Sequence, residues 1–97
     1  MTTTYTVNTI LESLGYADPM LAARQQARMQ LLGRLARYQA HLQEFEQKWG
    51  VTLTEMRQRY ERHNSEDFAV DDDYLQWQWY AEAAKTIESQ LEIINAG

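Results

Sequence analysis

The longest helical segment predicted by this sequence is longer than the diameter of a compact chain of 97 residues. Asp18 and Pro19 form a strong helix start, with aspartate as the N-cap and proline in the first turn. From Pro19 to Trp49 good helix formers dominate, and only Gly33 interrupts them before Gly50 ends the segment. A helix over this range is about 46 Å long at ~1.5 Å per residue. A compact globule of 97 residues is only ~32 Å across.

An apolar seam along this helix indicates that it packs against another helix. Large apolar side chains recur at alternating spacings of three and four residues, which is the heptad pattern of a coiled coil. The members of this seam are Leu31, Leu35, Tyr38, Leu42, Phe45 and Trp49. Toward the N-terminus the same line meets Arg28 and Arg24, so the seam is polar near its beginning. Because the helix must project beyond a compact monomer, we expect another chain to cover part of the seam.

A short helix and a linker are expected before the long helix. Residues 7–14 predict one short helix, and Gly15 provides a left-handed residue that ends it. Its apolar face consists of Ile10, Leu11 and Leu14. We expect this helix and a linker to make up residues 1–17.

A capping box marks the start of the next helix. Thr52 is the N-cap and Glu55 stands three residues later, while Val51 and Met56 occupy the positions of a hydrophobic staple. This pattern predicts a short helix over about 53–63. Its apolar stripe consists of Leu53, Met56 and Tyr60.

The last helix is expected to follow a polar and acidic connector over 64–73. Asp71–Asp73 favour its start through capping and the helix dipole, so we expect a helix over about 72–95. Its seam has the same alternating spacing and consists of Trp77, Tyr80, Ala84, Ile87, Leu91 and Ile94. No strand-like alternation competes with this interpretation. The sequence therefore predicts one all-α domain over residues 1–97, an elongated helical hairpin or bundle with coiled-coil-like packing.

The sequence offers little material for catalysis. It has no cysteine, which excludes a disulfide scaffold, a thiolate zinc site and a cysteine nucleophile. His41 and Glu44 stand three residues apart and could share a metal ion, but a metal site needs three or four ligands and the sequence has no second His–Glu unit. We therefore expect His41 and His63 to lie on solvated helix faces. Asp71–Asp73 are consecutive and point in different directions on a helix, which favours capping over catalysis. We expect no enzymatic activity, no cofactor and no metal.

Targeting signals are also missing from the sequence. No apolar run approaches the ~20 residues that a membrane-spanning helix needs. The first seven residues have neither the basic nor the apolar region of a signal peptide. We therefore expect a cytoplasmic protein with no membrane partner.

Charge is distributed unevenly beneath a formal net charge of −5. The stretch 19–43 carries four arginines and no acid, whereas 61–73 carries six acids and one arginine. The four arginines are Arg24, Arg28, Arg34 and Arg37. Either the acidic connector folds beside the basic helix, within one chain or across a dimer, or the two stretches meet phosphate groups and a basic partner protein. Arg24 and Arg28 lie on the seam line, which favours an interface over nucleic-acid contacts.

The most unusual segment is the aromatic stretch from Tyr74 to Tyr80. Trp77 and Trp79 are about 200° apart at ~100° per residue, so one helix cannot bury both on one face. Trp77 belongs to the seam, and Leu75 and Trp79 form a second patch on the opposite side. Two interpretations stay open for Trp79. It packs under the first or third helix of the same chain, or it anchors a partner protein, since Trp and Tyr dominate binding hot spots.

The stretch from about Leu42 to Ile94 resembles small helical antitoxin-like proteins of archaea and bacteria that are encoded beside type II toxins. The shared features are a short capped helix, an acidic connector, and the motifs Lys48-Trp49-Gly50 and Asp72-Asp73-Tyr74-Leu75-Gln76-Trp77. Those proteins carry an acidic residue near the tryptophan, where this chain has Gln76 and Gln78. Residues 1–40 lie outside the resemblance. It implies a basic toxin as partner, wrapped by the acidic segment and the aromatic residues.

Together these patterns predict a non-enzymatic protein–protein interaction module that forms a homo-oligomer, a dimer or larger, and binds a basic toxin-like protein. One alternative is a self-assembling structural bundle. Another is a nucleic-acid-binding protein that uses the arginine-rich helix, although no ribbon-helix-helix or helix-turn-helix reader is recognisable. The expected interface residues are Arg24, Arg28, Leu31, Leu35, Tyr38, Leu42, Asp72, Asp73, Leu75, Trp77 and Trp79.

Overall fold

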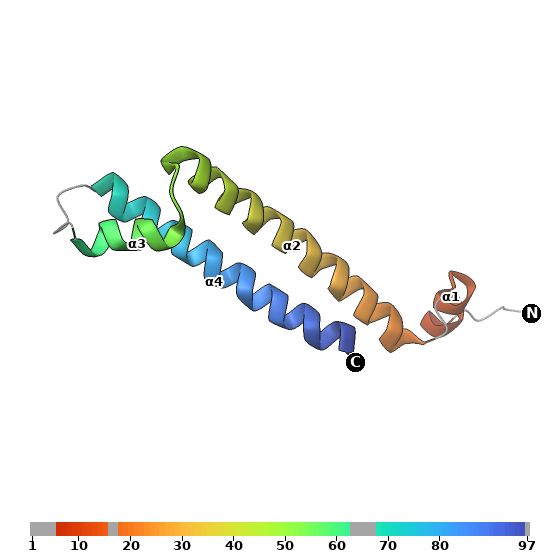
Figure 1. The fold of residues 1–97 in the computed structure, drawn as a ribbon. Helices are drawn as coiled ribbons and strands as arrows, with labels where there is room; N and C mark the ends of the chain where they lie inside the picture. Colours follow the sequence, from red (N-terminus) through yellow and green to blue (C-terminus); the bar gives the residue numbers. More distant parts are fainter. Residues whose placement is uncertain (1–5, 16–17, 63–67, 97) are drawn as a thin grey trace, which may run out of the picture.

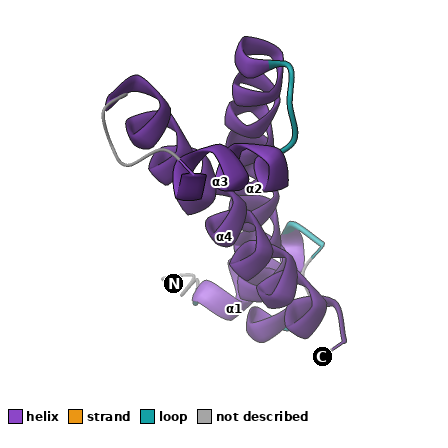
Figure 2. Cartoon of the chain, turned by 60° about the vertical axis from the view of Figure 1, so that its left-hand side comes forward, coloured by secondary structure: helices purple, strands orange, loops and turns teal. Residues whose placement is uncertain are grey.

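The computed structural model describes residues 6–15, 18–62 and 68–96, and its regular elements there are all helices (Figure 1). The elements are α1 (Val7–Ser13), α2 (Pro19–Trp49), α3 (Leu53–Arg62) and α4 (Phe68–Ala96). The same ranges contain no strand in the turned view of Figure 2. The predicted all-α class and the two predicted long helices, α2 and α4, are therefore confirmed.

Local capping fixes both ends of α2 where the sequence predicts them. The Asp18 carboxylate accepts a hydrogen bond from the Met20 backbone N–H at 3.0 Å, and Pro19 occupies the first turn. At the other end Gly50 adopts a left-handed φ of 64° and donates its backbone N–H to the Glu46 carbonyl at 2.8 Å. Both caps satisfy backbone groups that a helix end leaves without partners.

The N-cap bond of the predicted capping box is present at the start of α3. The Thr52 hydroxyl oxygen accepts a hydrogen bond from the Glu55 backbone N–H at 3.2 Å. The helix begins at Leu53 and ends at Arg62. His63, the predicted last residue, lies outside the described residues.

The start of α4 differs from the prediction. This helix begins at Phe68, several residues before the aspartates that were expected to open it. Val70 is buried in a core cluster with Met56 and Tyr74, so packing against α3 holds this turn helical. Asp71 consequently lies inside the first turn and does not cap the helix.

The two long helices form an antiparallel hairpin that α3 closes at one end (Figure 1). Trp49 at the end of α2 contacts Asp73 near the start of α4, and Tyr38 lies against Tyr80 with ring centroids 5.9 Å apart. The core at the closed end comprises Met56, Val70, Tyr74 and Trp77, with Leu42, Phe45, Trp49, Val51, Leu53 and Tyr60 packed against it. Burying a side chain such as Met56 stabilises the fold by about 2 kcal/mol.

The molecule is much longer than a compact chain of its size. Its radius of gyration is 21.2 Å and its extents are 75 × 26 × 19 Å. A compact chain of this length has a radius of gyration near ~12.5 Å. No residue of α2 is fully buried, although the helix spans 31 residues. The expectation that the long helix projects beyond a compact monomer is confirmed.

Helix α1 lies beyond the N-terminal end of α2, at the opposite end of the molecule from α3 (Figure 1). It ends at Ser13, close to its predicted end, and Gly15 has a left-handed φ of 96°. Ile10 and Leu14, two members of its predicted apolar face, are exposed. The side chain of Leu11, the third member, lies outside the described part.

Candidate interaction surface

The hairpin has a closed end, which contains α3, and an open arm in which α2 and α4 pack mainly on each other. We define the open arm as residues 19–38 of α2 and 79–96 of α4. Its buried side chains are Ala84, Ile87 and Leu91, all from α4. The seam residues Leu31, Leu35 and Tyr38 of α2 are half-buried. Two helices bury less of each other than a three- or four-helix bundle does, so the arm keeps apolar surface in contact with solvent.

A continuous groove runs along one side of the open arm. Its half nearer α3 has a volume of about 340 Å³ and is lined by Arg34, Tyr38, Trp79, Glu82, Ala83, Thr86, Ile87 and Gln90. The other half has a volume of about 380 Å³ and is lined by Ala27, Gln30, Leu31, Arg34, Gln90, Ile93 and Ile94. Because Arg34 and Gln90 line both halves, we treat the two halves as one groove and call it the arm groove.

Trp79 stands at the rim of the arm groove. Its ring meets Tyr38 edge to face, with centroids 5.7 Å apart and planes at 84°, and it meets Tyr80 in the same manner at 5.1 Å. Within the chain, Trp79 therefore packs on Tyr38 of α2, whereas the sequence predicted packing under the first or third helix. The side chain remains 57% exposed, so it is also accessible to a partner.

Further apolar side chains lie on the same face of α4 as Trp79. Leu75 is 52% exposed, Phe68 81% and Ile93 73%. At ~100° per residue these four positions fall within about 40° of one another around the helix. We call Phe68, Leu75, Trp79 and Ile93 the outer stripe of α4. The sequence prediction included only Leu75 and Trp79, although the heptad spacing could have identified the other two.

Trp77 has a different position from the rest of the predicted interface. It is 1% exposed and stacks on Phe45 with centroids 5.7 Å apart and planes at 13°. The neighbouring Tyr74 stacks on Tyr60 of α3 at 4.5 Å, and its hydroxyl accepts a hydrogen bond from Arg57. The structure places Trp77 in the core of its own chain, where it holds α4 against α2. Leu42 is half-buried against the same core.

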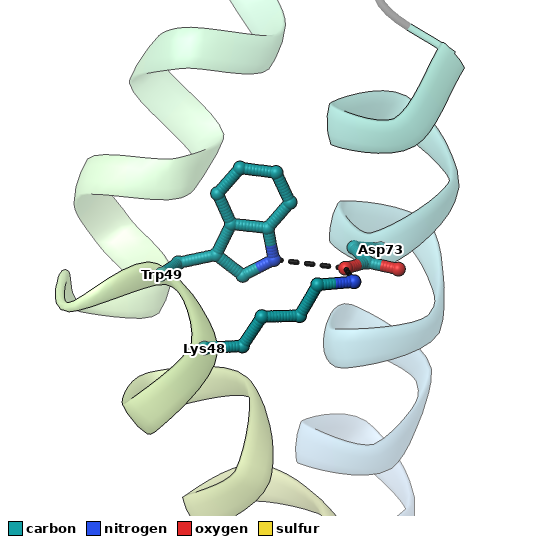
Figure 3. Close-up of polar contacts among 3 residues, drawn as sticks. All are labelled: Lys48, Trp49 and Asp73. Atoms are coloured by element: carbon teal, nitrogen blue, oxygen red, sulfur yellow. Dashed lines mark hydrogen bonds and ion pairs between the residues drawn. The ribbon is translucent and has the colours of Figure 1, made fainter.

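Asp73 joins the end of α2 to α4 (Figure 3). One carboxylate oxygen accepts hydrogen bonds from the Lys48 ammonium group at 2.6 Å and from the Trp49 indole N–H at 2.9 Å. Partial burial by itself raises the pKa of Asp73, but the two hydrogen bonds and the positive charge of Lys48 outweigh it, so the pKa is lowered. Asp72, the adjacent residue, is exposed. The sequence predicted both aspartates as interface residues, and the structure gives Asp73 a role inside its own chain.

The acidic start of α4 lies far from the arginines of α2. Asp73 pairs with Lys48, and Arg37, the nearest of the four arginines, lies eleven residues before Lys48, about 16 Å along the helix. In the described ranges, none of the four arginines has an ion-pair partner. Asp73 therefore lies beside the C-terminal end of α2 and not beside the arginine stretch of its own chain. Glu66 and Asp67 of that connector are outside the described residues.

The four arginines do not form one basic face. Arg34 lines the arm groove, whereas Arg24, half-buried, and Arg28, exposed, line a smaller depression of about 150 Å³ beside Ile94. Arg28 and Arg34 are about 120° apart around the helix at ~100° per residue. Leu21, almost one turn before Arg24, lines the same depression and is 40% exposed, so the N-terminal part of α2 is only partly covered by the end of α4.

The histidine and carboxylate pair noted in the sequence is a local contact. His41 Nδ1 lies 3.5 Å from a Glu44 carboxylate oxygen, and the His41 ring stacks on Tyr80 at 4.4 Å. Among the residues that the structure describes, no three His, Asp or Glu side chains gather as metal ligands do. Nor does any helix in this part of the chain combine the length and apolar character that a membrane span requires.

Comparisons with known proteins give no match. No family model, no curated protein and no solved structure is similar to this chain at a significant level. The described residues form an all-α hairpin with one closed end and one open arm. The resemblance to antitoxin-like proteins rests on the residues quoted above.

Proposed function

We propose that this chain is a non-enzymatic protein–protein interaction module of the cytoplasm, and that its open arm is the binding surface. The observation that carries the proposal is the arm groove, which has Trp79 and Ile93 of the outer stripe at its rim. An exposed tryptophan beside a groove that is apolar in part is typical of an anchor in a protein interface. Arg34 and Glu82 in the same groove add the polar contacts that give such interfaces specificity.

Site-specific photo-crosslinking in living cells tests this proposal. A photoreactive residue is placed at Gln90, which lines both halves of the arm groove, or at Gln43, an exposed position of α2 outside it. We expect adducts of discrete mass from position 90 and not from position 43. If neither position gives an adduct, or both give the same ones, the arm groove is not the binding surface.

A second candidate is the antitoxin-like role, with a basic toxin as partner. It is favoured by the exposed Phe68 and Asp72 at the start of α4, which offer an apolar and an acidic group one turn apart. Co-expression with the product of an adjacent gene tests it. We expect the two proteins to co-purify and the Phe68→Ala/Asp72→Lys variant to lose the partner, whereas Gln43→Ala retains it. A neighbour that neither inhibits growth nor binds this chain contradicts this role.

A further inference from the structure

The chain exposes more surface than a compact monomer of its mass. Its accessible area is 7542 Å², against about 5,800 Å² for a compact chain of 11.4 kDa. The excess is roughly 1,700 Å², whereas a stable protein–protein interface buries about 800 Å² on each partner. This excess, counted over the whole chain, is about twice the area that one partner contributes to such an interface, so it is large enough for a second copy of the chain to form a stable dimer.

The two long helices carry opposite net charges. Helix α2 contains five basic and two acidic residues, a net charge of +3 with histidine neutral. Helix α4 contains six acidic residues and one lysine, a net charge of −5. A second hairpin can lie on the first so that α2 faces α2, or so that α2 faces α4. Only the second arrangement sets opposite charges against each other in the open arm, where α2 (19–38) carries four arginines and no acid and α4 (79–96) carries three glutamates and one lysine.

The arm groove has one charge of each sign available for such a contact. Arg34 of α2 and Glu82 of α4 line the same half of the groove. Neither side chain belongs to an ion pair among the described residues. With two copies, Arg34 of each chain can approach Glu82 of the other, and the contact occurs twice because a two-fold interface is self-complementary.

We infer that the arm groove binds a second copy of this chain, giving a four-helix bundle in which the two hairpins point the same way and α2 of each copy faces α4 of the other. The two-fold axis of this dimer runs parallel to the long axis of the hairpin. The inference rests on the proposed function and specifies its partner. Trp79 of each copy then lies against α2 of the other copy, at the edge of the new core.

Light scattering coupled to size-exclusion chromatography tests the second copy. We expect a mass twice that of the 11.4 kDa chain at ~100 µM and a shift toward the monomer on dilution, since binding follows mass action. A monomer at ~100 µM overturns the inference. Photo-crosslinked adducts with other proteins would in that case still support the proposed function, so the two failures are distinguishable.

Charge reversal tests which helices face each other. We expect Arg34→Glu and Glu82→Arg each to raise the Kd of the dimer about tenfold, which corresponds to two exposed ion pairs of ~0.7 kcal/mol. An equimolar mixture of the two variants should associate as the wild type does, because each chain then meets an opposite charge. Arg59→Glu, the same change on an exposed position of α3, should leave the Kd unchanged. Failure of the mixture to recover association contradicts the α2-to-α4 arrangement.

Disulfide trapping tests the same arrangement through a covalent product, and the absence of native cysteines removes any background. After mild oxidation, a mixture of Arg34→Cys and Gln90→Cys chains should form a mixed disulfide. Gln43→Cys mixed with Gln90→Cys is the control and should form none. A disulfide between two Arg34→Cys chains would instead show α2 against α2 and overturn the inferred orientation.

Discussion

The carboxylate of Asp73 accepts two hydrogen bonds at the point where α2 ends, and thus ties the closed end of the hairpin together (Figure 3). Lys48 is 60% exposed, so its ion pair contributes little, at most about 1 kcal/mol. The Trp49 indole N–H is part-buried, and a charge-assisted hydrogen bond in such a place contributes about 1.5–3 kcal/mol. The tryptophan contact therefore dominates at this site.

We expect Asp73→Ala to lower the free energy of unfolding by about 2 kcal/mol, because it leaves the Trp49 N–H without its acceptor. Asp72→Ala removes the same charge from the adjacent exposed position and should change it by less than about 0.5 kcal/mol. Urea unfolding of the three proteins at pH 7 measures both changes. Equal losses from the two substitutions would mean that general charge, and not this contact, sets the stability.

The same carboxylate predicts a pH dependence. The pKa of Asp73 is lowered in the folded chain, so its stabilising contribution is fully present above the ordinary aspartate pKa of about 3.9. The contribution is lost as the pH falls from that value through the lower folded pKa. Urea unfolding at several pH values should therefore show a constant difference between wild type and Asp73→Ala above about pH 5, and a smaller difference near pH 3. A difference that grows on acidification would reverse the assigned sign.

At the scale of the elements, the sequence predicts the helix ends that neighbouring residues determine, but not those that depend on contacts between distant residues. The bounds of α2 follow from Asp18, Pro19 and Gly50, and the sequence alone predicts both. The start of α4 depends on Val70 packing near Met56, a contact between residues fourteen positions apart that no local pattern reveals. The site divides in the same way. Leu75 and Trp79 are recognisable as a second patch from spacing, but the Tyr38 contact of Trp79 requires the antiparallel register of two helices.

Gly33 lies inside α2 and Gly50 is its C-cap residue, and replacing each by alanine should change the stability of the chain in opposite directions. Gly50 has a left-handed φ of 64°, and an added Cβ would meet no atom within 4 Å, so only backbone strain opposes a side chain there. We expect Gly50→Ala to destabilise the chain by about 1 kcal/mol. Gly33 lies inside the helix with the same open space, and Gly33→Ala should stabilise it by up to about 1 kcal/mol. Thermal unfolding followed by circular dichroism compares them, and the same sign for both would contradict the cap.

At the scale of the whole molecule, the 75 Å length combines two parts with unequal cores. The closed end contains the two most completely buried large side chains, Trp77 and Met56. The open arm buries Ala84, Ile87 and Leu91 and exposes the rim residues Trp79 and Ile93. Local stability follows buried apolar contact, so the arm opens more readily than the closed end in an isolated chain.

This inequality predicts a concentration-dependent pattern of amide hydrogen exchange. At ~1 µM we expect the backbone amides of residues 80–96 to exchange at least tenfold faster than those of residues 70–78, because few buried contacts oppose local opening of the arm. At ~100 µM the arm amides should become protected, since a second copy in the arm groove stabilises the closed form by mass action. The closed end is its own control, because its protection arises within one chain and should change much less. Equally fast exchange of the arm amides at both concentrations would mean that no second copy covers the arm groove.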